Sequence, residues 1–216
     1  MGAAIRMEPI EVRDRLRELG LDQAKLAEVV RRGYYQFITC TPNDPPLFPG
    51  FSAWAMTVRA LREYLVPEGW RRSDENNYSL VINDGATVAI AVSTGDDATG
   101  QADRNPSTKS SKGPSTIDAV SANRIQLSLF ADLPVLPASA RAPARDSSWI
   151  TWILLVNRST NEVRCELSLP SSMGEDGRVD EWQERIILGS LSLDTDFVEE
   201  TPPALPDITV EVTRRA

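Results

Sequence analysis

The chain of 216 residues contains no histidine, and almost all of its basic side chains are arginine. Without histidine there can be no His-containing catalytic triad, no histidine general base and no histidine metal ligand. The only lysines are Lys25, Lys109 and Lys112. At a net charge of −8, the chain lacks the clustered positive charge that broad binding to phosphates requires, so we expect no extensive contact with nucleic acid.

Cysteine and long apolar runs are also scarce. Cys40 and Cys165 lie far apart and form no cysteine-rich framework, which favours a reduced, cytoplasmic setting. No apolar run approaches the roughly 20 residues needed to span a bilayer, so no membrane contact is expected. Hydrophobic residues make up 41% of the chain, enough for a buried core, and one domain is the simplest organisation.

The first 70 residues have helical patterns. Proline and glycine signals predict a helix over 9–19. A second helix is expected to begin after the capping residue Asp22 and to end at Gly33. A third is expected over about 51–65, after a proline-rich loop.

The third helix carries large apolar side chains at spacings of three and four, which puts them on one stripe. These residues are Phe51, Trp54, Val58, Leu61 and Leu65. The stripe has two interpretations: core packing against the rest of the domain, or an aromatic binding surface.

Strand patterns occupy residues 78–93 and 149–193. The first region reads as a hairpin around Asn83-Asp84-Gly85, which is a turn sequence. Residues 149–156 are apolar on both faces, which is typical of a central strand.

The next predicted strand, 163–169, alternates between apolar and polar residues. Its polar members, including Glu166, are expected to face solvent, whereas Cys165 is expected to be a small core residue. A fifth strand is expected over 184–188. The fold class is therefore α+β, with N-terminal helices packed on a largely antiparallel sheet of about five strands.

Two segments depart from this globular texture. Residues 95–148 are rich in small, polar and proline residues at both ends and read as an inserted loop or linker. Residues 194–216 form an acidic, proline-bearing tail.

An apolar stretch inside the insertion contains Gln126, Leu127, Ser128, Leu129 and Phe130. This pentapeptide resembles the short peptide by which many bacterial replication and repair proteins dock on the ring-shaped DNA sliding clamp. From average residue usage, a chance match in a chain of this length is on the order of one in several thousand. The resemblance implies that Leu and Phe anchors fill an apolar cleft on the clamp while the Gln amide fixes orientation. The alternative is that the same residues continue a helix begun near Thr116 and pack in the core.

A second candidate site lies in the polar part of the insertion. Ser107, Thr108, Lys109 and Lys112 could hold a phosphate group through ammonium charge and backbone N–H groups just before a helix start. Asp96 and Asp97, at a strand end, are weak candidates for a magnesium site. The chain nevertheless contains no Gly-Lys-Ser/Thr sequence, so this is not a P-loop.

These patterns give two functional hypotheses from different classes. The resemblance implies a non-enzymatic accessory or regulatory protein, with no cofactor, that the sliding clamp recruits in bacterial replication, repair, mobile-element or defence biology. The alternative is a small enzyme or nucleotide-binding domain that uses residues 95–116.

Overall fold

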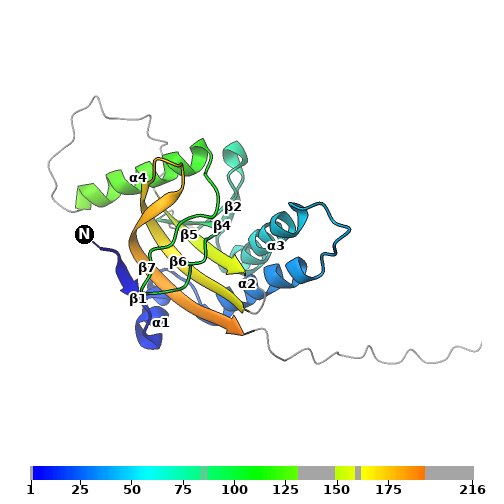
Figure 1. Ribbon diagram of the computed structural model, residues 1–216. Helices are drawn as coiled ribbons and strands as arrows, with labels where there is room; N and C mark the ends of the chain where they lie inside the picture. Colours follow the sequence, from blue (N-terminus) through cyan, green and yellow to red (C-terminus); the bar gives the residue numbers. More distant parts are fainter. Residues whose placement is uncertain (1, 84, 86, 131–148, 159–161, 193–216) are drawn as a thin grey trace, which may run out of the picture.

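The computed structural model describes residues 2–83, 85, 87–130, 149–158 and 162–192, and its fold is α+β, as predicted (Figure 1). Within these residues, four α-helices accompany a mixed sheet of seven strands rather than five. The count was wrong because the two edge strands are only three residues long and too short to show a pattern of alternation. The predicted tail, 194–216, lies outside the described residues.

The elements follow in chain order. The helices are α1 (Pro9–Glu18), α2 (Gln23–Ile38), α3 (Phe48–Leu65) and α4 (Pro114–Phe130), with the short 3₁₀ helices η1 (Val66–Glu68) and η2 (Glu75–Asn77). The strands are β1 (Ala4–Arg6), β2 (Arg71–Ser73), β3 (Leu80–Ile82), β4 (Val88–Thr94), β5 (Ile150–Arg158), β6 (Glu162–Met173) and β7 (Val179–Ser192).

The sheet order is β1-β7-β6-β5-β4-β3-β2. The β1–β7 and β4–β5 pairs are parallel, and the other four pairs are antiparallel. The predicted hairpin is β3–β4, and the predicted central strand is β5, which lies in the middle of the sheet. Because β4 and β5 are parallel neighbours, the chain between them must return to the starting end of the sheet, and α4 lies on that return path.

Helices α1, α2 and α3 lie on one face of the sheet. The main core lies between these helices and the sheet. The helices contribute buried side chains such as Leu16, Leu26, Val30, Leu61 and Leu65. The sheet contributes others such as Ile90, Trp152, Leu154, Cys165, Leu167 and Ile186. Cys165 is a buried core residue, as predicted, and burial raises the pKa of its thiol to about 12.

The opposite face is covered by α4 and by residues 95–113. The buried apolar residues here form a smaller cluster around Val120, Ile153, Leu155, Val179 and Trp182. The first part of the predicted linker is thus packed against the sheet, and residues 131–148 lie outside the described residues. No helix in the described part of the chain is both long and apolar enough to cross a membrane.

The sequence predicted that the second helix ends at Gly33. That prediction was wrong, because α2 continues through Gly33 to Ile38. A Cβ at Gly33 would collide with the Thr57 side chain and lie 2.9 Å from the Ala53 carbonyl oxygen of α3. Glycine therefore allows α2 and α3 to cross closely at this point, and the residue serves helix packing rather than helix termination.

Candidate functional site

Helix α4, which carries the predicted docking peptide, is fixed to the sheet by one polar residue. Asn123 is completely buried. Its Nδ2 donates to the Thr151 carbonyl at 2.8 Å and to the Pro170 carbonyl at 3.3 Å, and its Oδ1 accepts from the Thr151 N–H at 2.8 Å. The amide thereby ties the middle of α4 to β5 and β6, and its buried polar atoms are satisfied.

The residues Gln126–Phe130 form the last turns of α4. The backbone is therefore helical here, as the alternative interpretation expected, while the side chains of these five residues lie outside the described part. The two residues before the peptide, Arg124 and Ile125, are exposed. In Figure 1 the C-terminal end of α4 lies outside the outline of the sheet.

The structure brings the two halves of the predicted phosphate loop together. Gly95 and Thr108 form an isolated antiparallel bridge, and the Asp96 N–H donates to the Ser107 carbonyl at 2.9 Å. The Lys109 N–H donates to the Thr94 carbonyl, and the Lys112 N–H donates to the Gly177 carbonyl. These backbone donors, which a phosphate cradle would need, are hydrogen-bonded inside the fold.

The side chains of this loop have different surroundings. Thr108 is wholly buried, and its hydroxyl donates to the Ser110 carbonyl and accepts from the Val179 N–H. Lys109 is exposed, whereas partial burial lowers the pKa of Lys112. Asp97 is hydrogen-bonded to Arg104 at 3.0 Å, which lowers the pKa of its carboxyl.

The structure does not arrange Asp96 and Asp97 as the predicted magnesium site would require. The Asp96 carboxylate accepts the Ala98 N–H at 3.1 Å, as in a polar turn. Among the described residues, no group of three or more Cys, Asp or Glu side chains is placed to hold a metal ion. The loop site thus stays a sequence-based prediction.

A buried ion pair lies under this loop. Arg185 of β7 and Glu166 of β6 are joined by two hydrogen bonds, of 2.7 Å and 3.1 Å. Glu166 also accepts the Ser168 hydroxyl at 2.7 Å and the Gly100 N–H at 2.8 Å. Arg185 donates to the carbonyls of Gln101 and Arg104. The pair therefore binds residues 100–104 to the sheet.

The expectation that Glu166 faces solvent was wrong, because residues 95–113 cover that side of β6. Both Glu166 and Ser168 are completely buried. The alternation correctly separated the two faces but could not reveal that a distant segment shields the polar one. One sequence signal was available: Arg185 lies in a predicted strand directly before the apolar run Ile186-Ile187-Leu188, where an arginine needs a partner.

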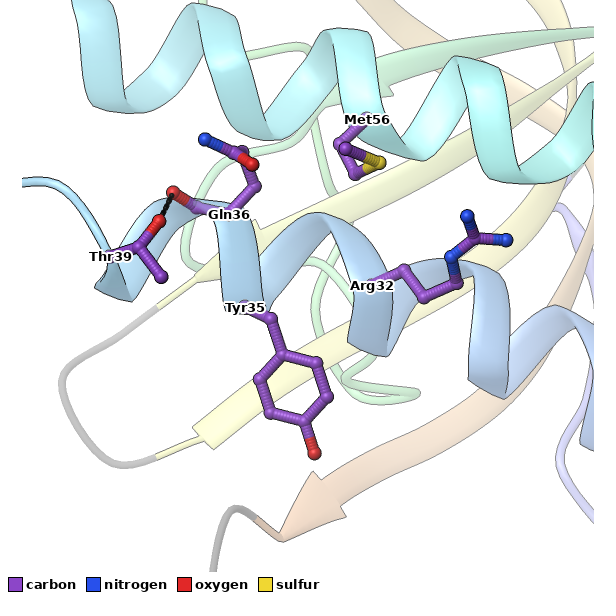
Figure 2. A pocket seen from close by; sticks show the side chains of 5 residues that line it. All are labelled: Arg32, Tyr35, Gln36, Thr39 and Met56. Atoms are coloured by element: carbon purple, nitrogen blue, oxygen red, sulfur yellow. Dashed lines mark hydrogen bonds between the residues drawn. The ribbon is translucent and has the colours of Figure 1, made fainter. Parts of the chain in front are cut away.

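A shallow groove runs between α2 and α3 on the side away from the sheet. Figure 2 shows Gln36 and Thr39 on α2 and Met56 on α3 along this groove, with the Arg32 guanidinium at one end. Its cavity volume is about 280 Å³. The Thr39 hydroxyl donates to the Gln36 carbonyl at 2.9 Å, and Arg32 pairs with Glu63 at 2.6 Å.

Comparison with known proteins yields no relative: no family model, no curated protein and no solved structure matches this chain.

Proposed function

We propose that this protein is a non-enzymatic accessory or regulatory protein of bacterial DNA replication, repair or mobile-element biology, recruited to the DNA sliding clamp through Gln126–Phe130. The observation that supports the proposal is the place of the peptide in the fold. It begins three residues after the buried anchor Asn123 and follows two exposed residues, at the end of a helix.

The end of a helix is a suitable place for a docking peptide. The last four carbonyl groups of a helix lack an intrahelical partner, so the terminal turns open at lower cost than the middle. The peptide can therefore bind as a helix or after its turns unwind, while Asn123 keeps the rest of α4 on the sheet. The body of the protein need not change shape when the clamp is bound.

Charge supports the same division of labour. Helix α4 contains one acidic and one basic residue, Asp118 and Arg124, so it brings no net charge to an apolar cleft. The whole chain carries a charge of −8, which keeps the body away from DNA phosphates. On this proposal, contact with DNA-bound machinery comes from the peptide rather than from direct attraction to DNA.

The test is a titration of the purified protein against a bacterial sliding clamp. Leu127→Ala/Phe130→Ala is the test variant, and Ile117→Ala, at an exposed position on the same helix, is the matched control. We expect micromolar binding that the double variant loses and the control retains, with unchanged unfolding midpoints for both. A synthetic peptide covering residues 122–132 should compete with the intact protein.

Two results of the titration would contradict the proposal. One is a wild-type protein that does not bind the clamp at concentrations far above micromolar. The other is a double variant that binds as tightly as the wild type.

A further inference from the structure

The α2–α3 hairpin carries an exposed apolar surface at its tip. Among the described residues, five of the eleven exposed large hydrophobic side chains are in the short stretch from the end of α2 to the start of α3. We name them the tip patch: Phe37, Ile38, Leu47, Phe48 and Phe51. Figure 1 shows that the connection between α2 and α3 lies beyond the ends of the strands.

The tip patch exists because the core-facing stripes of both helices run past the sheet. On α2, Phe37 follows Gly33, at the crossing with α3, by one turn. On α3, the predicted apolar stripe divides: Val58 is buried, whereas Phe51 is 62% exposed. The buried part of the stripe confirms core packing, and around Phe51 the binding-surface interpretation stays a prediction. Apolar side chains at spacings of three and four are therefore exposed to solvent where the helices extend past the sheet.

The tip patch is held in shape by contacts of its own. Cys40, just beyond α2, lies 3.6 Å from Ser52 of α3, measured from Sγ to Oγ. The ring of Phe51 lies 5.7 Å from that of Trp54, whose indole N–H donates to the Val92 carbonyl at 3.0 Å. The two helix ends are therefore tied to each other and to β4, so little ordering remains to be done on binding.

The α2–α3 hairpin is poor in charged residues near the tip patch. Between Arg32 and Arg59 the only charged residue is Asp44, in a chain of which 25% is charged. Two copies with a charge of −8 each repel one another, and the repulsion is weakest where neither presents a charge. The tip patch is such a surface.

The size of the tip patch matches what one subunit of a dimer contributes. At ~200 Å² for a fully exposed large apolar side chain, the patch exposes on the order of 500 Å². A stable interface buries about 800 Å² on each partner, and in homodimers about 65% of that area is apolar. The patch alone supplies about the required apolar share.

We propose that a second copy of this chain covers the tip patch, so that the protein is a homodimer whose two α2–α3 hairpins pack against each other. The interface is isologous, with the same residues from each copy. It lies on the helical face of the sheet, whereas α4 lies on the other face, so both docking peptides stay clear of it. The proposal does not depend on clamp binding.

The experiment measures the molar mass of the purified full chain by light scattering and sedimentation equilibrium, without clamp, up to about 100 µM, which is a hundred times a micromolar Kd. Phe51→Glu and Leu47→Glu place a charge in the tip patch. Ile10→Glu is the matched control, because Ile10 of α1 is 66% exposed and lies outside the patch. Leu47 is 86% exposed, so its replacement cannot unfold the core.

We expect the wild type and Ile10→Glu to have twice the mass of one 23.8 kDa chain. Phe51→Glu and Leu47→Glu should each raise the dimer dissociation constant at least about 30-fold, the effect of losing one central side chain, and so shift the mass toward that of the monomer at every concentration. A wild type that stays monomeric at 100 µM overturns the proposal and assigns the patch to a different protein. A dissociation constant that is unchanged in both patch variants overturns it as well, because another surface then holds the dimer.

Discussion

Arg185 and Glu166 form an ion pair, with Nη2 and Oε2 2.7 Å apart, that is almost wholly removed from water. The exposed fractions of the two side chains are 2% and 0%. Each partner also binds the backbone of the covering loop, Arg185 through two carbonyls and Glu166 through the Gly100 N–H. The pair thus connects β6, β7 and residues 100–104 in one hydrogen-bonded network.

Removing the arginine should strongly destabilise the fold. Arg185→Met leaves Glu166 buried without its counter-ion, a loss of about 3–5 kcal/mol in the free energy of unfolding. Urea titration followed by tryptophan fluorescence measures it. Arg178→Met is the control, because its pair with Asp176 is exposed on both sides and should change stability by less than ~0.5 kcal/mol. Equal stability of the two variants would contradict the network described above.

Gly33→Ala tests the close crossing of α2 and α3. The added methyl group meets the Thr57 side chain and the Ala53 carbonyl, so the helices must separate, at about 1–3 kcal/mol. Gly50→Ala is the opposite control, since nothing lies within 4 Å of the new Cβ and alanine favours a helix by roughly 0.5–1 kcal/mol. The midpoint of thermal unfolding should therefore fall for Gly33→Ala and rise for Gly50→Ala. A stabilised Gly33→Ala would disprove the crossing.

The stability of the protein should fall in acid partly because of Glu184. Burial alone would raise the pKa of this carboxyl, but hydrogen bonds from Arg15 and Arg6 outweigh it, so the pKa lies below its ordinary value. A carboxyl of this kind stabilises the fold above its unfolded pKa, about 4.3, and the contribution is lost as pH falls through the folded value.

Glu184→Gln should lower the free energy of unfolding at pH 7 by about 1–2 kcal/mol and make its decline below about pH 4.3 shallower. Denaturant titrations at a series of pH values measure both effects. Glu18→Gln is the comparison, because Glu18 pairs with Arg15 from an exposed position. If the two variants show the same pH profile, Glu184 does not carry the effect.

The two cysteines should react at different rates with a disulfide reagent at pH 8. Burial, and then the nearby charge of Glu166, raise the pKa of Cys165 to about 12, so its thiolate is scarce and inaccessible. Cys40 is only half-buried. We expect one thiol to react quickly and the second only as fast as the protein unfolds. A Cys40→Ser variant should lose the fast phase; a fast phase that remained would show that Cys165 is open to solvent.

Local signals predicted much of the fold. Asp22 caps α2 as expected, with its carboxylate accepting the Lys25 N–H at 2.9 Å. A stretch that is apolar on both faces located the central strand, and alternation identified the inward face of β6 correctly. These features depend on residues that are close in sequence, and a single chain displays them directly.

Features set by distant segments could not be read in the same way. Gly33 has the same local signature whether it ends a helix or admits a neighbour, and only the position of α3 decides between them. The polar face of β6 became interior because residues 95–113 lie on it, and the α3 stripe became partly exposed because the sheet ends before Phe51. For the peptide, the sequence foresaw both a helix and a docking segment, and the helix is present.

The parallel β1–β7 pair has a consequence for the order of folding. Ala4 pairs with Glu184, and the sheet face on which α1–α3 pack includes Ile186. During synthesis from the N-terminus, Leu16, Leu26 and Leu61 are therefore made long before the residues of β6 and β7 that pack in the same core. The β5–β6–β7 meander needs only local contacts and should form first, whereas joining β4 to β5 must close the long loop between Val88 and Ile150. The first helices to be synthesised should thus be among the last parts to be buried.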